Sequence, residues 1–208
     1  RGIKLKILLF KIGALGDILM TTPLIRQLRK KYPDAQIDYL CGKSFSQIII
    51  NKKNLNNSIT FDENIIYNKK IFKCLNLIKK IKLKKYNKIY VLDKHWIFSL
   101  FSFLSKIKER IGFYRDFPSK IFLTKHIKYK TVKHEIYYYL SLLNKYNKTD
   151  TKLDFYISNN DEKKIKKYLK NKQINKFIVF INSGGDNPGE KNNIRKLSNR
   201  EFLNELEK

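Results

Sequence analysis

The sequence predicts an α/β fold in which a parallel sheet is covered by helices on both sides. Short apolar runs of strand type alternate along the chain with longer segments of helical spacing. The first unit, ILLFKIGALGDILMTTPLIRQLRKKYP at 7–33, shows this most clearly, because an apolar run leads through two glycines into an amphipathic segment. With 208 residues, of which 42% are apolar, the chain is long enough to bury a substantial core.

The expected elements follow each other in regular alternation. Strands are expected at 6–12, 36–41, 58–61, 88–92, 110–113 and 176–181, and helices at 17–31, 45–51, 69–83, 96–107, 132–146, 163–170 and 199–207. In the helix at 69–83, the inward face is expected to hold Ile71, Leu75, Ile78 and Leu83. Residues 114–130 show no regular period, so we expect a loop there, and its length suggests a binding element.

The acid in the first turn is the best placed residue for chemistry. Asp17 follows a predicted strand and lies near the start of a helix, where open α/β sheets place their ligands. Gly13 and Gly16 allow a tight turn and a close approach of the backbone. The alternative is an ordinary acid stabilised by the helix dipole. The spacing G-x-x-G-D lacks the G-x-G-x-x-G fingerprint, so a nicotinamide enzyme is not supported.

The segment KIGALGDILMTTPLIRQLRKKYPDAQIDYL resembles the opening of the heptosyltransferase-type glycosyltransferases of family 9. Leu15-Gly16-Asp17 and Thr21-Thr22-Pro23 match the family pattern, although its first serine is replaced. Later stretches agree in the same order: YNKIYVLD (86–93), ERIGF (109–113), HEIYYYLSLLNKY (134–146) and FIVFINSGGDNPGEKNNIRKLSNREF (177–202). Matches in the right order across nearly the whole chain make the resemblance specific.

The resemblance implies two Rossmann-like domains in a GT-B arrangement. Residues 1–150 would then form the N-terminal, acceptor-side domain, 151–175 a linker with a basic helix, and 176–208 the incomplete start of the C-terminal, nucleotide-sugar-binding domain. The implied activity is inverting transfer of a heptose or related sugar from a nucleotide-sugar donor, ADP-heptose, to a lipid-linked acceptor such as the lipopolysaccharide core. We expect the fragment alone to be inactive, since most of the donor site would be missing.

On the acceptor side, Asp17 is the expected catalytic base, because glycosyl transfer requires a carboxylate that takes the proton of the acceptor hydroxyl. The other acceptor-side candidates are Gly16, Asp93, Arg115 and Lys120, with Lys125 in the same basic stretch. Asp93 is placed at the carboxyl end of a central strand. The basic side chains are candidates for phosphate groups, and the alternative is that they are solvated loop charges.

On the donor side, Ser183, Gly184 and Gly185 follow a predicted strand, and backbone N–H groups in such a turn bind phosphate oxygens. Arg195 and Lys196 are candidates to neutralise the departing diphosphate. The family has Trp-Pro after its basic residue, which this chain lacks, so either of the two takes that role. Apart from the resemblance, this is an ordinary glycine-containing connection. No D-x-D triplet is present, so no metal or other cofactor is expected.

The composition is strongly basic, with 45 Lys and Arg against 18 Asp and Glu and a net charge of +27. A nucleic-acid-binding module is therefore a rival interpretation. The lysines are scattered along the chain and no nucleic-acid-binding signature accompanies them, so we expect no nucleic-acid partner. An anionic membrane surface is a better fit to the resemblance, which implies a cytoplasmic enzyme at the inner face of the bacterial inner membrane. A different α/β enzyme that uses a nucleotide sugar is the second rival.

Cysteine and histidine give little support to metal chemistry. Cys41 and Cys74 have no partner at metal-ligand spacing, which indicates reduced, buried thiols. His95, His126 and His134 form no H-E-x-x-H pattern, so a zinc hydrolase is not indicated. His134, at the start of a helix, is expected to cap or pack.

Overall fold

The structure is a computed structural model that describes residues 5–49, 53–130 and 132–177. The chain divides into two compact units, Arg1–Tyr156 and Ile157–Lys208. The strand expected at 176–181 and the helix at 199–207 lie outside the described residues, apart from the first two positions of that strand. The two units are therefore described separately.

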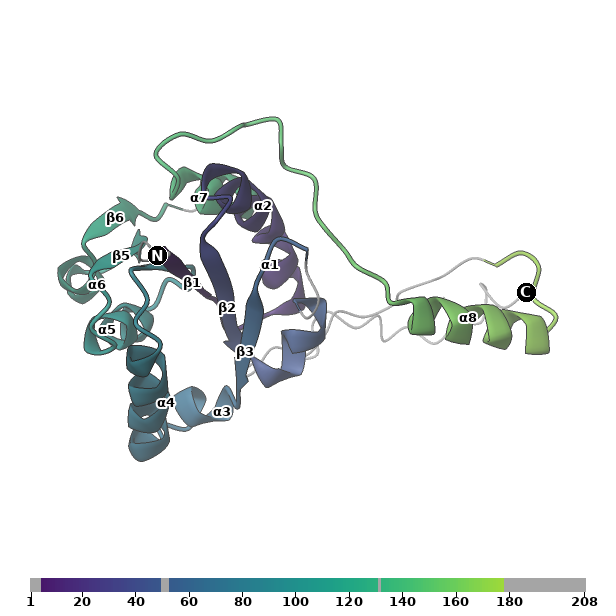
Figure 1. Cartoon of the computed structure of the whole chain (residues 1–208), viewed down its shortest axis with the longest axis horizontal. Coiled ribbons are helices and arrows are strands. Elements are labelled where there is room, and N and C mark those ends of the chain that lie inside the picture. Colours follow the sequence, from purple (N-terminus) through teal and green to yellow (C-terminus); the bar gives the residue numbers. More distant parts are fainter. Residues whose placement is uncertain (1–4, 50–52, 131, 178–208) are drawn as a thin grey trace, which may run out of the picture. The chain divides into compact units, whose positions relative to one another are not determined.

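The first unit is built on one parallel sheet, whose six described strands have the order β3-β2-β1-β4-β5-β6 (Figure 1). The strands are β1 (Lys6–Phe10), β2 (Gln36–Gly42), β3 (Asn57–Phe61), β4 (Lys88–Val91), β5 (Glu109–Tyr114) and β6 (Lys125–Lys128). The chain runs outward from β1 to β3 and then returns to the other side of β1 with β4. The strand order thus reverses between β1 and β4, which creates a switch point where open α/β sheets bind ligands.

Helices cover both faces of this sheet (Figure 1). One face is covered by α1 (Leu15–Met20), α2 (Thr22–Lys31), the 3₁₀ helix η1 (Lys43–Ile48) and α7 (Glu135–Ser141). The other face is covered by α3 (Asn64–Tyr67), α4 (Ile71–Leu83), α5 (Trp96–Leu104) and α6 (Phe117–Phe122). The predicted α/β class and the layered arrangement are confirmed.

Strand β1 supplies side chains to both core layers because successive strand residues point to opposite faces. Ile7 and Leu9 pack under α1, α2 and α7, whereas Leu8 and Phe10 pack under α3, α4 and α5. All four are fully buried. This explains why β1 is a continuous apolar run, as expected for a central strand of a parallel sheet.

The first helix is divided into α1 and α2, where the sequence predicted one continuous helix over 17–31. Pro23 has no N–H to donate to the carbonyl oxygen of Leu19, and the hydroxyl of Thr22 donates to that oxygen instead, at 2.7 Å. The Thr21 hydroxyl similarly donates to the Ile18 carbonyl oxygen, at 2.7 Å. The threonines therefore satisfy carbonyl groups at the joint between α1 and α2.

The expectation of a loop at 114–130 was wrong. The segment contains α6 and the edge strand β6, which pairs with β5. Asp116 caps α6 by accepting from the backbone N–H of Ser119 at 2.8 Å, and Pro118 occupies the first turn. The capping acid and the proline are helix-start signals. Strand β6 is a short edge strand in which only Ile127 is partly buried, so it does not read as an apolar run.

The expected inward face of α4 was also largely wrong. Leu77 and Ile81 are buried, and Ile78 is partly buried, whereas Ile71, Leu75 and Leu83 are exposed. Apolar residues occur around most of this helix, so the helical period alone did not distinguish the face that meets the sheet. The result is a helix with apolar side chains on its outer side.

The end of the first unit is attached to α2. Arg26 contacts Asp150 and Asp154 at 2.6 Å each, and the Gln27 side chain bonds to the backbone of Asn147. The sequence placed residues 151–175 in a linker, and the structure attaches 151–154 of this stretch to the first unit. In the second unit, α8 (Asn159–Asn171) begins at Ser158, whose hydroxyl accepts from the N–H of Asp161. The basic helix expected at 163–170 is thus present with a longer extent.

None of the helices in the described part of the chain is long and apolar enough to cross a membrane.

Candidate active site at the carboxyl edge of the sheet

The candidate site lies at the switch point, where β1 and β4 end side by side. Lys11 follows the last residue of β1, and Asp93 lies two residues beyond β4. Asp17, the sequence-predicted base, lies in the first turn of α1, six residues after Lys11. The topology therefore brings together two positions that are 82 residues apart in the chain.

Lys11 lies between the two carboxylates. Its Nζ is 2.5 Å from Asp93 Oδ1 and 3.1 Å from Asp17 Oδ2, and it also donates to the carbonyl oxygen of Gly13 at 2.7 Å. An ammonium group has three N–H donors, so each has one acceptor here. This arrangement fixes the ammonium group at the end of β1.

The environment keeps Lys11 charged although its side chain is only 6% exposed. Burial by itself lowers the pKa of the Lys11 ammonium, but Asp93 and Asp17 more than offset that effect, so the pKa lies above its ordinary value. One cation with two carboxylates leaves this group of three side chains with one net negative charge.

Asp17 is the accessible member of the group. Its side chain is 40% exposed, compared with 12% for Asp93. The ion pair with Lys11 uses Oδ2, and within the described residues Oδ1 has no partner. The N-cap position of α1 is occupied by Ala14, so Asp17 is not a capping residue. It is a half-exposed carboxylate held in place from one side.

The two glycines of this turn have different surroundings. A Cβ atom at Gly13 would lie 2.7 Å from the ring of Phe45, so the turn requires a close approach there. A Cβ atom at Gly16 would meet no atom within 4 Å. Gly16 therefore borders open space beside Asp17, and the described fold gives no packing reason for a glycine at this position.

Both oxygens of Asp93 have protein partners. Oδ1 contacts Lys11, and Oδ2 accepts from the backbone N–H of Ile12 at 2.8 Å. Asp93 was expected to contact the acceptor. Its two bonds instead connect the end of β4 to the segment that follows β1, and they hold the Lys11 side chain that contacts Asp17.

A second group of charged and aromatic side chains surrounds Tyr129, just beyond β6. Lys94 Nζ lies 4.2 Å from the centre of the Tyr129 ring, and the Arg115 guanidinium lies 4.6 Å from it. Glu135, at the start of α7, forms a 2.6 Å ion pair with Lys94 and accepts from the Tyr129 hydroxyl. Arg115 remains exposed, as expected of a side chain that could meet an anionic ligand.

The other basic candidates do not join Asp17. Lys120, on α6, has its ammonium 6.0 Å from the ring centre of Tyr114. Lys125 begins β6 and pairs with Glu109, which begins β5, at 2.8 Å. Because these are parallel strands, Lys125 lies at the amino edge of the sheet, opposite the candidate site. Lys125 therefore lies apart from Asp17, and its contact with an acceptor stays a prediction.

His134 and His95 both act as helix caps. The Nδ1 atom of His134 accepts from the N–H of Ile136 at the start of α7, which confirms the expected capping role, and His95 caps α5 in the same way. Cys41 is buried, and burial raises the pKa of its thiol to about 12, whereas Cys74 is only partly buried. Within the described ranges, no group of three His, Cys, Asp or Glu side chains is placed to hold a metal ion.

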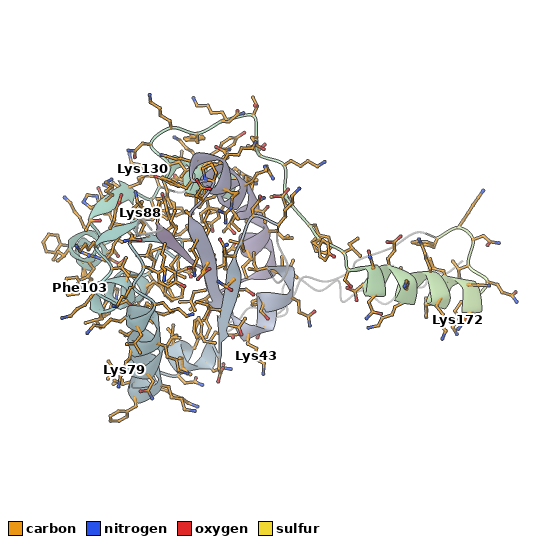
Figure 2. The ribbon with its side chains drawn as sticks, viewed as in Figure 1. Lys43, Lys79, Lys88, Phe103, Lys130 and Lys172 are labelled. Atoms are coloured by element: carbon orange, nitrogen blue, oxygen red, sulfur yellow. The ribbon has the colours of Figure 1, made fainter. Side chains whose placement is uncertain are left out.

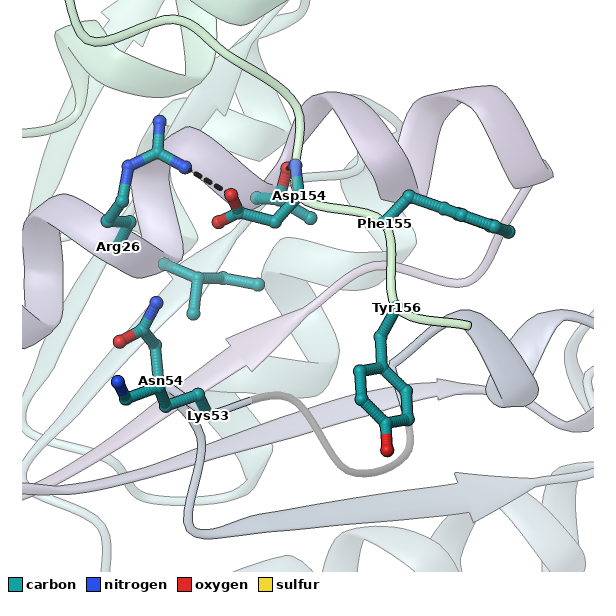
Figure 3. Close-up of a pocket in the computed structure, with 8 residues that line it drawn as sticks. Arg26, Lys53, Asn54, Asp154, Phe155 and Tyr156 are labelled. Atoms are coloured by element: carbon teal, nitrogen blue, oxygen red, sulfur yellow. Dashed lines mark hydrogen bonds and ion pairs between the residues drawn. The ribbon is translucent and has the colours of Figure 1, made fainter. Parts of the chain in front are cut away.

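A surface hollow of about 370 Å³ lies elsewhere in the first unit (Figure 3). It is lined by α2, by Lys53 and Asn54, and by the segment from Asp154 to Tyr156. Figure 3 shows the ion pair between Arg26 and Asp154 at its rim. None of the residues of the candidate active site lines this hollow. The five donor-side candidates, namely Ser183, Gly184, Gly185, Arg195 and Lys196, lie outside the described residues.

Lys11 is the site residue that the sequence analysis missed. The signal was present, because a lysine interrupts the apolar run ILLFKIG, and a buried lysine requires a charged partner. The sequence did not identify the partners of Lys11, because Asp93 becomes adjacent to Lys11 only when β1 and β4 pair in the sheet.

Comparison with known proteins places this geometry in context. No protein-family model matches the chain. The Escherichia coli protein "Lipopolysaccharide heptosyltransferase 3" is 31% identical over 98 residues, which are 47% of this chain and 29% of that protein. The chain thus covers less than a third of the length of this curated relative.

Solved structures match over a larger part of the chain. The crystal structure of the glycosyl transferase family 9 from Veillonella parvula DSM 2008 has a TM-score of 0.71 and 21% identity, covering 81% of this chain and 49% of that one. E. coli ADP-heptose lps heptosyltransferase II has a TM-score of 0.63 and 21% identity, covering 81% and 50%. E. coli heptosyltransferase WaaC with ADP has a TM-score of 0.56 and 16% identity, covering 72% and 51%.

The fold defines the class: this is an α/β chain whose parallel sheet matches GT-B heptosyltransferase structures over about half their length. Within that class the chain resembles glycosyltransferase family 9 and is lipopolysaccharide heptosyltransferase-like. Both the fold class and the family resemblance inferred from the sequence are thereby confirmed.

Proposed function

We propose that this chain is the acceptor-side part of an inverting glycosyltransferase, in which Asp17 is the catalytic base. One observation carries the proposal: a half-exposed carboxylate is fixed by a buried lysine at the switch point of the sheet, next to open space at Gly16. The matches to heptosyltransferases support the reaction class.

In the proposed reaction, Asp17 takes the proton of an acceptor hydroxyl while that oxygen attacks the anomeric carbon of the sugar. The new C–O bond forms as the bond between sugar and diphosphate breaks, and the nucleoside diphosphate leaves with the electron pair. A single displacement of this kind inverts the anomeric centre. Lys11 contacts Oδ2 and orients the carboxylate of Asp17, and Oδ1 is available to accept the proton.

The remaining acceptor-side residues have different proposed roles. Gly16 leaves room for the acceptor beside Asp17, and Arg115 and Lys120 offer positive charge to its phosphate groups. Asp93 is better suited to a positioning role than to direct contact, because both of its oxygens are already occupied. Ser183, Gly184, Gly185, Arg195 and Lys196 are proposed to hold the donor diphosphate.

We further propose ADP-heptose as the donor and the lipopolysaccharide core, or a similar lipid-linked glycan, as the acceptor. The names of the matched proteins support this choice, since they include a lipopolysaccharide heptosyltransferase and an ADP-heptose enzyme. The proposed place of action is the cytoplasmic face of the bacterial inner membrane. Because the chain spans about half of the matched structures, these proposals concern the complete transferase.

The test is the substitution Asp17→Asn in the complete transferase. Loss of the base is expected to lower turnover at least about 100-fold with little change in the affinity for the nucleotide sugar, because the proposed role of this carboxylate is to bind the acceptor hydroxyl and not the donor. Turnover is measured as release of the nucleoside diphosphate in the presence of acceptor.

Asp34→Asn is the matched control, because Asp34 is an exposed acid that follows α2, remote from the switch point. This variant should retain full turnover. Near-normal turnover of the Asp17→Asn variant, with donor binding intact, would remove Asp17 from the role of base. If both variants lose activity together with their thermal transition, the fold and not the chemistry is affected.

A further inference from the structure

The outer side of α4 is apolar and basic at once. Phe72 is 83% exposed, Leu83 70% and Ile71 67%, and Leu75 is half-exposed. At 100° per residue these side chains occupy one arc of the helix, and Lys79 and Lys82 lie within the same arc. Figure 2 labels Lys79 on α4, among side chains that project from this helix.

This arc continues into an apolar groove between α4 and α5. The groove has a volume of about 450 Å³. Its walls are formed by Ile71, Leu75 and Ile78 of α4 and by Trp96, Leu100 and Leu104 of α5. Exposed apolar surface of this kind is uncommon on a protein that contacts only water, so a partner is expected.

All the charged residues of the stretch that contains α4 are positive. No aspartate or glutamate occurs between Glu63 and Asp93. The same stretch contains Lys69, Lys70, Lys73, Lys79, Lys80, Lys82, Lys84, Lys85 and Lys88. The partner must therefore present a dense negative surface with apolar material immediately beneath it.

A bilayer with anionic headgroups has both properties. A helix that lies in the interface places aromatic and aliphatic side chains among the acyl chains and lysines at the headgroups. A second copy of the chain is a poorer match, because a two-fold contact through this face would oppose lysine to lysine. Nucleic acid would satisfy the lysines but would leave most of the aliphatic groove without a partner.

We propose that the outer arc of α4 and the groove between α4 and α5 form a docking surface for anionic lipid. Phe72 and Trp96 enter the interface, and Lys79 and Lys82 contact the headgroups. The surface begins near the candidate active site, because α5 starts three residues after Asp93. Exposure and charge define this docking surface, which is independent of the catalytic role of Asp17.

The chain contains a single tryptophan, Trp96, which lines the groove and reports directly on its occupancy. We would titrate the 208-residue protein with vesicles of phosphatidylcholine and phosphatidylglycerol in equal amounts. Emission should shift to shorter wavelength and be quenched by lipids brominated on their acyl chains. Vesicles of phosphatidylcholine alone should bind at least about tenfold more weakly.

Two variants separate the apolar and the electrostatic parts. Phe72→Ser should weaken binding about tenfold, and Lys79→Glu combined with Lys82→Glu at least about tenfold. The controls are Tyr137→Ser, an exposed aromatic on α7 at the other face of the sheet, and Lys145→Glu combined with Lys148→Glu, an equal change of net charge elsewhere. The altered side chains are exposed, so circular dichroism should be unchanged.

Several results would overturn the proposal. Equal binding to neutral and anionic vesicles would do so, as would variants of α4 that bind no more weakly than their controls. A concentration-dependent dimer that Phe72→Ser dissociates in the absence of lipid would assign the face to a second copy. Binding of a single-stranded oligonucleotide that requires Lys79 and Lys82, with no blue shift on vesicles, would assign it to nucleic acid.

Discussion

Each end of the central sheet buries a charged group, but the two groups differ in how completely their partners enclose them. At the carboxyl edge, Lys11 is shared between two carboxylates, and one of these, Asp17, is 40% exposed. Toward the amino edge, the carboxylate of Asp38 in β2 is fully buried. It accepts from the hydroxyl of Tyr86 at 2.6 Å and from the side-chain amides of Gln36 and Asn57 at 2.8 and 2.9 Å.

The difference separates a fully enclosed carboxylate from the one that we propose as the catalytic base. Asp38 is fully buried and both of its oxygens accept from neutral donors, so it is not accessible to a ligand. Asp17 keeps one oxygen without a partner among the described residues and faces open space at Gly16. Burial of a carboxylate alone therefore does not indicate a site in this protein, and the proposal for Asp17 depends on its incomplete pairing beside open space.

The largest expected effect is at Lys11. Lys11→Met leaves Asp93 buried without its cation and close to a second carboxylate, which should lower the free energy of unfolding by roughly 3 kcal/mol. Urea denaturation measures this change. Adding Asp93→Asn should restore a large part of the loss, because the double variant no longer buries an unpaired charge. If Lys11→Met lowers the free energy of unfolding no more than Lys30→Met, which breaks an exposed ion pair with Asp150, the carboxyl edge does not depend on a buried cation as described.

A smaller effect is expected at the amino end. Tyr86→Phe removes one donor to the buried Asp38 carboxylate and should lower the free energy of unfolding by about 2 kcal/mol in the same urea experiment. Tyr139→Phe is the matched control, because the Tyr139 hydroxyl is buried and has no partner among the described residues. That control should be neutral or slightly stabilising. Equal losses in both variants would show that Tyr86 contributes packing and not its bond to Asp38.

The smallest effect is a dependence on alkaline pH. Burial and the hydrogen bond to Asp38 raise the pKa of the Tyr86 phenol. Tyrosine in the unfolded chain ionises near pH 10, so the stabilisation by the protonated Tyr86 phenol is fully present below about pH 10. It is lost as the pH rises toward the higher pKa of Tyr86 in the folded protein. The loss is about 1.4 kcal/mol per pH unit. The urea stabilities of wild type and Tyr86→Phe should therefore converge between about pH 10 and about pH 11. Parallel curves would show that Tyr86 ionises at the same pH in both states.

The fold was largely predictable, because it depends on local patterns that the sequence displays. The apolar run of β1 and its two glycines mark the strand and the turn before α1, and the positions of the strands through β5 are correct within a few residues. The predictions were wrong for the buried face of α4 and for residues 114–130, where the sequence pattern is compatible with more than one structure. Apolar residues surround most of α4, and the edge strand β6 is polar on one side.

The candidate site was only half predictable. Asp17 could be proposed from its place after a strand and from a family resemblance, which both depend on neighbouring residues. The partners of Lys11 depend on the pairing of β1 with β4, which no local spacing encodes. A lysine in the middle of an apolar run signals that a buried partner exists but not which one.

The attachment of residues 147–154 to α2 has a consequence for where this unit can be divided. Arg26 holds Asp150 and Asp154, and the Thr22 hydroxyl accepts from the backbone N–H of Asp154 at 2.9 Å. A protein that ended at residue 150 would lose the ion pair between Arg26 and Asp154. It would also expose the side of α2 that residues 151–154 cover. A cut that separates the two units should therefore come after Tyr156, so that residues 147–154 stay intact on the first unit.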